Sequence, residues 1–196
     1  FVQTLDWTRS FGKHDLGALV GYEAIRNWGF NTDMAKQGAA DASLTDLSTY
    51  TELSNITGTT WENTSRSFFG RLTYAYKSRY LFEVNARYDG SSRFAPESRW
   101  GFFPSFSGGW RVSEESFMQG SPFDNLKIRL SWGKLGNNSI GDYEWQATYS
   151  GSNYIFGDKL TSGLAQTVIA NQKLRWESVT QTNIGLDFAI LNNRLV

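Results

Sequence analysis

Residues 66–88, RSFFGRLTYAYKSRYLFEVNARY, decide the fold class. Most even positions are apolar or aromatic, among them Phe68, Leu72 and Val84, whereas most odd positions are polar. Successive side chains of a β-strand point to opposite faces of the sheet, so this alternation predicts strands with one apolar and one polar face. The polar triplet Lys77-Ser78-Arg79 predicts a short turn between two such strands. The segment as a whole is therefore expected to be an antiparallel hairpin.

The same alternation recurs along the chain, while helical periodicity is nearly absent. Short polar turns are predicted at 12–15, 77–79 and 192–194. Pro104 cannot donate a hydrogen bond to a neighbouring strand, so regular pairing is expected to be interrupted or bulged there. The fold class is all-β and antiparallel, with strands predicted at residues 2–11, 16–28, 66–77, 80–89, 100–112, 125–134 and 177–190.

The other connections are long, and we expect external loops at 29–64, 89–99 and 134–175. Short turns at one end of the strands and long loops at the other are typical of outer-membrane β-barrels. Residues 143–149 also alternate, but a membrane crossing there would place the turn 192–194 on the external side. Residues 134–175 are therefore expected to be one external loop with some local β-structure.

Composition excludes several other classes of protein. The 196 residues carry 19 basic and 19 acidic side chains and no cysteine. This balance argues against a nucleic-acid partner, and the lack of cysteine excludes disulfide scaffolds and thiolate metal sites. Mean hydropathy is −0.43 and no apolar run is long enough for a transmembrane helix. Transmembrane β-strands alternate apolar and polar residues, so these hydropathy values do not exclude a β-barrel.

The aromatic excess needs its own explanation, because 16% of the residues are aromatic and 8 are tryptophan. Tyr74, Tyr76 and Tyr80 gather at the predicted turn 77–79, and Trp110 lies near the end of its strand. Amphipathic aromatic rings settle at the level of lipid headgroups, so this placement favours a membrane barrel over a soluble β-sandwich.

The predicted strands do not close a barrel. After the turn at 192–194 only Leu195 and Val196 remain, as the start of another strand. Bacterial barrels have an even number of strands, with a minimum of about eight. Open edges in lipid would leave backbone groups without hydrogen bonds, so we expect the seven strands and the stub to be a piece of a longer chain.

Four stretches resemble the C-terminal half of the barrel of SusC/RagA-type TonB-dependent transporters. The resemblance runs from about residue 66 to the end of the chain, with the stretches in the same order and spacing. They are YDGSSRF (88–94), RWGFFPSFSGGWR (99–111), LKIRLSWGKLGN (126–137) and WESVTQTNIGLDF (176–188).

This resemblance implies a barrel of about 22 strands in the outer membrane, filled by an N-terminal plug and energised through TonB. It also implies a SusD-like surface lipoprotein as partner, and active import of oligosaccharides or peptides. The chain would then supply about a third of such a barrel. The plug domain and the TonB box would lie outside residues 1–196. The protein would be a transporter and not an enzyme, and no cofactor is expected.

Two sets of residues are candidates for function. Polar residues opposite the apolar stripe are expected to face the barrel lumen: Arg71, Glu83, Asn85, Arg87, Arg129 and Asp187. Aromatic residues of the predicted loops are candidates for contact with substrate or partner, because rings beside amides stack on sugars and pack against proteins equally well. These are Trp61, Tyr143, Trp145, Tyr149 and Tyr154. Packing of the loops against one another is the alternative for each of them.

The alternative function is a soluble or secreted all-β module that binds carbohydrate. A glycosidase is not supported, because Glu114 and Glu115 are adjacent and would point in different directions, whereas the reaction needs two carboxylates across a cleft. They are more consistent with the start of a helical turn in the connection 113–125. His14, the single histidine, is expected to be a solvated turn residue.

Overall fold

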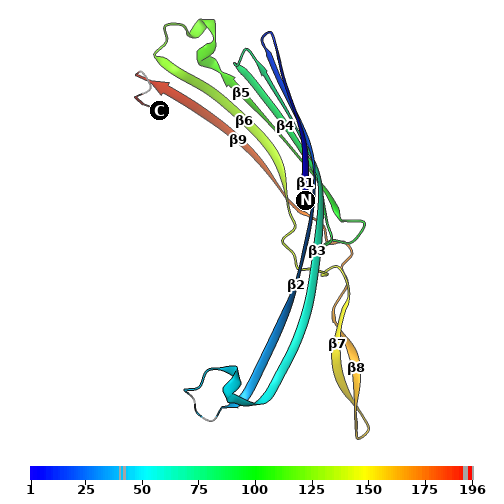
Figure 1. The fold of residues 1–196 in the computed structure, drawn as a ribbon. Helices are drawn as coiled ribbons and strands as arrows, with labels where there is room; N and C mark the ends of the chain where they lie inside the picture. Colours follow the sequence, from blue (N-terminus) through cyan, green and yellow to red (C-terminus); the bar gives the residue numbers. More distant parts are fainter. Residues whose placement is uncertain (40, 42, 192–193, 196) are drawn as a thin grey trace.

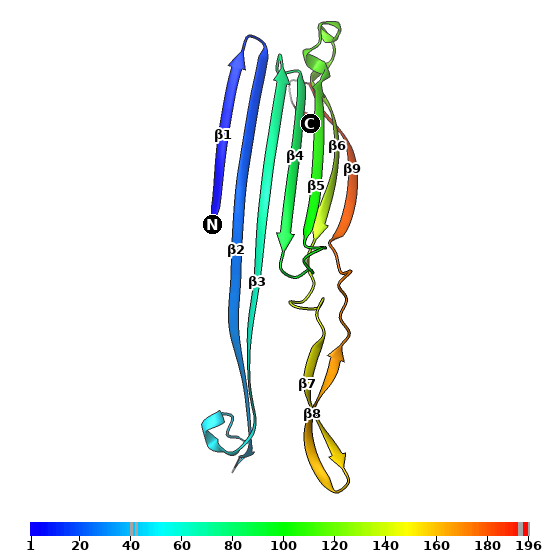
Figure 2. The ribbon, with the colours of Figure 1, turned by 90° about the vertical axis from the view of Figure 1, so that its right-hand side faces the viewer.

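A computed structural model describes residues 1–39, 41, 43–191 and 194–195, which form one curved sheet of long strands and a separate hairpin (Figure 1). The sheet is antiparallel with the order β1-β2-β3-β4-β5-β6-β9, and Figure 2 shows the strands side by side. The strands are Val2–Phe11 (β1), His14–Ala39 (β2), Tyr50–Tyr76 (β3), Tyr80–Ser91 (β4), Trp100–Arg111 (β5), Phe123–Asn137 (β6), Thr148–Phe156 (β7), Lys159–Val168 (β8) and Glu177–Ile190 (β9).

All seven predicted strands are present. The predicted bounds 2–11 and 177–190 are those of β1 and β9. Of the expected loop 134–175, residues 134–137 belong to β6 in the main sheet, whereas residues 138–175 stay outside it, because β6 pairs directly with β9. β7 and β8 form a two-stranded sheet of their own, beyond the end of the other strands (Figures 1 and 2).

The expected loop 29–64 is wrong, because most of it is strand. β2 continues to Ala39 and β3 begins at Tyr50, so the connection between them is 40–49 and contains the 3-10 turn Leu47–Thr49. The two strands pair throughout this ribbon with one register shift, between Ala35 and Lys36. Side chains on both of its faces are mostly exposed, so no buried face marks the ribbon. Backbone pairing extends the two strands, with cross-strand side-chain bonds such as Gln37–Glu52 beside it.

The other two long loops are also shorter than expected. β4 runs to Ser91, which leaves 92–99 as its connection to β5. β6 runs to Asn137, and within the predicted loop 134–175 Tyr143 and Trp145 lie in a turn rather than in β-structure. Strand geometry begins only at Thr148, because Tyr143 has a positive φ of 66° that a strand cannot accommodate.

The short turns are placed as predicted. Gly12 and Lys13 join β1 to β2, and Gly12 has a φ of 61°, which glycine adopts without strain. Residues 77–79 join β3 to β4. Of the predicted turn 192–194, residues 192 and 193 lie outside the described residues. Ile190 and Leu195 nevertheless form an antiparallel bridge, so the chain reverses between them.

Pairing at Pro104 is interrupted as expected, but without a bulge. Pro104 keeps its register with Ala86 of β4, whereas pairing of β5 with β6 begins only at Ser105. The missing N–H of proline explains why the two strands separate at this residue. β6 continues past this point with β9 as its partner.

The sheet has two chemically different faces. We call apolar the face that carries Phe68, Leu72 and Val84, and polar the face that carries Arg71 and Asn85. Large apolar side chains are exposed on the apolar face, with 49–81% of their surface accessible for Val20, Leu72, Val84, Phe106, Leu130 and Ile184. Within the described residues no second sheet covers this face, so the interpretation as a soluble β-sandwich finds no support.

Two rows of aromatic rings border the apolar face. The first row lies at the short turns, where Tyr80 stacks between Tyr76 and Trp110 with ring centroids 6.3 and 6.4 Å away. His14 joins this row, 4.9 Å from the ring of Tyr76, and its Nδ1 is 2.9 Å from the Tyr74 hydroxyl. The expectation of a solvated turn residue is therefore wrong for His14, which begins β2.

The second row lies eight residues further along β2, β3 and β4 and ten further along β5, and contains Tyr22, Phe68, Tyr88 and Trp100. Tyr88 and Trp100 stack with centroids 4.8 Å apart. Eight residues of strand span about 27 Å. At the tilt of 35–45° that barrel strands adopt, this corresponds to a height of roughly 20 Å, close to the apolar band of outer-membrane barrels.

Candidate functional site

All six predicted lumen residues lie on the polar face. Arg71 is directly opposite Asn85, and Glu83 and Arg87 occupy the same face of β4 two residues to either side. Arg129 and Asp187 continue this face on β6 and β9. Strand alternation explains the agreement, because a period of two assigns every second side chain to one face once a single position is known.

A bidentate ion pair joins the last two strands of this face. Arg129 Nε donates to Asp187 Oδ2 at 2.7 Å, and its Nη2 donates to Oδ1 at 2.6 Å. Gly185 leaves the space that the guanidinium fills, since a Cβ there would be 3.1 Å from Nη2. Both side chains stay substantially exposed, so the pair presents charge to the solvent on this face.

Arg87 links three strands of the same face. Its guanidinium is 3.1 Å from Asp89 and 3.4 Å from Glu23 on β2, two strands away. It reaches Glu23 across the ring of Phe69, with Cζ 5.1 Å from the ring centroid. The Phe69 ring in turn lies against Gly21, where a Cβ would come within 2.3 Å of it. The flat ring therefore supports the long arginine side chain.

A hollow of about 920 Å³ occupies the part of the sheet nearer the short turns. Small and hydroxyl-bearing residues dominate the polar-face part of its wall, including Gly17, Thr73, Ser107, Gly109 and Ser131. Lys127 and Arg129 line it from β6. These short side chains leave room in the hollow and offer many hydrogen-bonding groups. Such a wall suits contact with water or with another polar protein surface better than apolar packing.

Loops cap the edge of β3 where β4 ends. Ser92 N–H donates to the Thr64 carbonyl at 2.9 Å, and Thr64 N–H donates to Ser92 Oγ at 2.9 Å. One step further along, the Tyr143 hydroxyl donates to the Glu62 carbonyl at 2.9 Å. These bonds satisfy backbone groups that an open strand edge would expose, and they bring the β4–β5 and β6–β7 connections to one place.

A polar cluster fills this junction, and sequence reasoning missed most of it. Arg93 Nε donates to Asp142 Oδ1 at 2.8 Å, and Asn63 Nδ2 donates to Asp142 Oδ2 at 3.2 Å. Asn27 Nδ2 donates to Asn63 Oδ1 at 3.0 Å. The only sequence signal was Arg93, which belongs to the stretch 88–94; the others come from distant segments that no spacing connects.

A small apolar core holds the same connections from another side. Phe94 is completely buried, and its ring centroid is 5.2 Å from that of Trp176. Phe103 is also 5.2 Å from Trp176, whose Nε1 donates to the Arg99 carbonyl at 2.9 Å. Buried aromatic contacts of this kind are rigid, so the junction is a fixed part of the structure.

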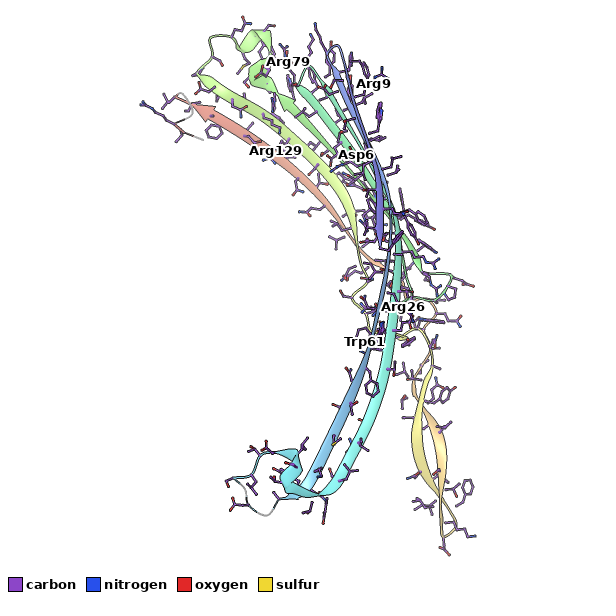
Figure 3. The ribbon with its side chains drawn as sticks, viewed as in Figure 1. Asp6, Arg9, Arg26, Trp61, Arg79 and Arg129 are labelled. Carbon is purple, nitrogen blue, oxygen red and sulfur yellow. The ribbon has the colours of Figure 1, made fainter. Side chains whose placement is uncertain are left out.

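The five aromatic candidates do not form one site. Trp61 is a residue of β3 rather than of a loop, and Figure 3 shows it on the ribbon of β2 and β3 that extends past the other strands. Tyr143 lies close to it through the bond to Glu62. Trp145 is half-buried, and its Nε1 is enclosed without a hydrogen-bond partner among the described residues. Tyr149 and Tyr154 lie apart from these, exposed on β7.

Glu62 and Glu115, at opposite ends of the sheet, each have a lowered pKa. Arg26 holds the pKa of Glu62 below its ordinary value by a bidentate bond at 2.9 Å on the external ribbon. At the other end of the sheet, the Tyr80 hydroxyl donates to Glu115 at 2.6 Å and Trp110 Nε1 donates at 3.1 Å. These two bonds, and then Arg79, lower the pKa of Glu115.

The helical turn expected in this connection is present as two short 3-10 turns, and Glu115 stands at the start of the second, but its side chain does not cap it. It lies between the 3-10 turns Val112–Glu114 and Ser116–Met118, without a side-chain cap bond in either. The connection 112–122 is instead fastened to the aromatic row by this carboxylate. Among the described residues no group of three or more His, Cys, Asp or Glu side chains could hold a metal ion, and no helix is long and apolar enough to span a membrane.

Comparison with known proteins agrees with this geometry. The family model described as TonB dependent receptor-like, beta-barrel, matches residues 1–196. The TonB-dependent receptor SusC of Bacteroides thetaiotaomicron is 36% identical over 97% of this chain, and the TonB-dependent receptor P3 of Formosa agariphila is 34% identical over 97%. The chain spans 19% of the length of each of these relatives.

Solved structures give the same result. A structure of the RagAB peptide transporter superposes with a TM-score of 0.85 and 31% identity, over 98% of this chain and 22% of that one. A curved single-layer sheet with an exposed apolar face, two aromatic rows and a polar opposite face is a segment of an outer-membrane β-barrel. The chain belongs to the TonB-dependent receptor β-barrel family, whose members are receptors and transporters rather than enzymes, and its place is the outer membrane.

Proposed function

We propose that the protein containing this chain imports oligosaccharides or peptides across the outer membrane, driven by TonB, together with a SusD-like surface lipoprotein. The observation that carries the proposal is the similarity to SusC over 97% of the chain. The superposition on the RagAB peptide transporter supports the same class of transport. Because the chain spans 19–22% of these proteins, the activity belongs to the whole protein.

The two faces of the sheet support this proposal physically. The apolar face between the aromatic rows suits contact with lipid, because nothing in the described residues covers it. The polar face, with Arg71, Glu83, Asn85, Arg87 and the Arg129–Asp187 pair, then lines the lumen. Charged residues are tolerated there because the lumen of a large barrel holds water and a polar plug.

Orientation follows from the connections. The turns at residues 12–13 and 77–79 are short, which is typical of the periplasmic end of a barrel. The ribbon of β2 and β3 and the hairpin of β7 and β8 extend from the opposite end (Figures 1 and 2), so both lie outside the cell. The junction at Arg93 and Asp142 is then at the external mouth of the barrel.

Uptake by the native host tests the proposal. A strain that lacks the full-length gene is supplied with labelled oligosaccharides and labelled short peptides, and complemented with the wild-type gene. We expect uptake of one of the two classes to depend on the gene and to stop when the inner-membrane proton gradient is collapsed. A control version without the segment that contacts TonB should not complement. Uptake that survives both treatments would contradict the proposal.

Copurification tests the partner. The full-length protein, extracted in mild detergent from its host, should carry a surface lipoprotein. The hairpin of β7 and β8 is a candidate contact, because Tyr149 and Tyr154 are 61% and 65% exposed on it. Replacing both by serine should reduce the recovered lipoprotein, whereas the same change at Tyr74, at the other end of the sheet, should not. Unchanged recovery from the hairpin variant would exclude this contact.

A further inference from the structure

The ribbon on which β2 and β3 extend past the other strands carries an indole ring that lies over a glycine of the neighbouring strand. Trp61 lies on β3 directly opposite Gly29 of β2. A Cβ at Gly29 would be 2.6–2.7 Å from three atoms of the indole, Cε2, Cζ2 and Nε1. Nearly equal distances to three ring atoms mean that the ring lies flat over the glycine. One face of the indole is therefore seated on the backbone, and Trp61 is half-buried with its other face directed away from the strand.

This ring borders a cleft of about 580 Å³, within the range of small-molecule sites in proteins. The cleft is lined by Trp61 together with Arg26, Asn27, Trp28, Asn63, Arg93 and Asp142. It is built from β2, β3 and the connections that follow β4 and β6. The buried core around Phe94 fixes those connections, so the polar groups hold their places relative to the ring.

The charges of the cleft are mutually satisfied. Arg93 pairs with Asp142 at 2.8 Å, and Arg26, which also lines the cleft, pairs with Glu62 at 2.9 Å. A ligand therefore meets no excess of either sign, which favours a neutral molecule over an ionic one.

Hydrogen-bonding capacity nevertheless remains at the rim. Asn27 and Asn63 each use one amide N–H in the chain of bonds that ends at Asp142. Among the described residues, the side-chain oxygen of Asn27 and the indole Nε1 of Trp61 have no hydrogen-bond partner. The site thus offers a flat apolar surface with a free donor and a free acceptor beside it.

We infer that this cleft binds a neutral saccharide, with a pyranose ring stacked on Trp61 and its hydroxyls bonded to Asn27, Asn63 and the Arg93–Asp142 pair. A sugar ring presents C–H groups on one face and hydroxyls around its edge, which matches a flat ring surrounded by planar polar groups. This inference rests on the proposed import function and names oligosaccharides as the substrate. The site is placed at the barrel mouth, where substrate first meets the transporter.

Binding of a panel of short neutral oligosaccharides to the full-length protein in detergent tests this, with neutral short peptides as the comparison panel. Trp61→Ala should weaken binding of the best saccharide about tenfold or more, while Trp61→Phe, which keeps an aromatic face, should weaken it far less. Gly29→Ala should also weaken it, because its Cβ displaces the seated ring.

The matched control is Phe30→Ala. Phe30 is 63% exposed and next to Gly29, but points to the opposite face of the ribbon and should leave binding unchanged. Folding of each variant is checked by the change in its electrophoretic migration on heating in detergent. Equal binding by the folded wild type and by folded Trp61→Ala would overturn the inference. Binding and uptake of peptides without saccharides would overturn it and leave the import function standing. Uptake of neither class would overturn the proposed function itself.

Discussion

Arginine at position 84 should destabilise the barrel far more than arginine at position 85. Val84 lies on the apolar face between Leu72 and Phe106, and 51% of its surface is exposed. It is four residues from Tyr80 and four from Tyr88, so it is midway between the two aromatic rows. If that face contacts lipid, Val84 is close to the centre of the bilayer.

The expected magnitude follows from this depth. Four residues of strand span about 14 Å. At the tilt of barrel strands, this places Val84 roughly 10 Å from either interface. An arginine side chain at that depth cannot easily place its guanidinium among the lipid headgroups. Val84→Arg should therefore cost about 2–4 kcal/mol, the range for the bilayer midplane.

Asn85→Arg is the matched control, one residue away on the polar face. There the new guanidinium has Glu83 beside it, whose carboxylate now accepts a bond from Asn85 at 2.8 Å. Arg71 is directly opposite, and a like-charge cross-strand pair costs at most about 1 kcal/mol. The net effect at position 85 should be well under that at position 84.

Both variants are made in the full-length protein and compared in outer-membrane fractions. The readouts are the amount of assembled barrel and the temperature at which heating in detergent changes its electrophoretic migration. Val84→Arg should lower both, and Asn85→Arg should lie near the wild type. Equal losses at the two positions, or a larger loss at 85, would refute the assignment of the faces.

Three further substitutions test other elements. Phe94→Ala empties a fully buried position and should cost about 3–5 kcal/mol, seen as faster proteolysis of the connection after β4; wild-type resistance would argue against a fixed junction. Arg129→Ala should lower the thermal unfolding temperature only slightly, because both partners are exposed to water; a loss as large as that of Phe94→Ala would show the pair to be screened from solvent. Glu115 has a lowered pKa in the folded protein, so its carboxylate contributes stability above about pH 4.3, which is lost as the pH falls further. Glu115→Gln should therefore flatten the acid side of the stability profile, and an unchanged acid side would contradict the role of the bond from Tyr80.

The strands between the aromatic rows could be predicted because their signal is local. Each residue there faces either an apolar or a polar environment, so a period of two is written into segments such as 66–88. The same rule assigned Arg71, Asn85 and Asp187 to one face without knowledge of any contact. A one-residue slip would reverse both faces of a strand, which is why the pattern also fixes the register.

The external ribbon could not be predicted for the converse reason. Residues 29–39 and 50–64 have mostly exposed side chains on both faces. The alternation of Phe30 and Met34 with polar neighbours does not continue through 50–64, so no sustained period of two distinguishes the ribbon from a loop. Backbone pairing in register extends β2 and β3 there, and that pairing is visible only in the structure. His14 shows a related limit, because the chain does reverse within the predicted turn 12–15, but the place of His14 in β2 and its contact with Tyr74, 60 residues away, were not predicted.

By itself, then, the sequence determined the all-β class, the short turns, the two faces and the family, since each of these depends on neighbouring residues or on motifs. The tertiary structure decided the site at the mouth. Asn27, Trp61, Arg93 and Asp142 belong to four segments, and only the capped edge of β3 and the core around Phe94 bring them together. Contacts between distant segments depend on how loops pack, and no local period encodes that packing.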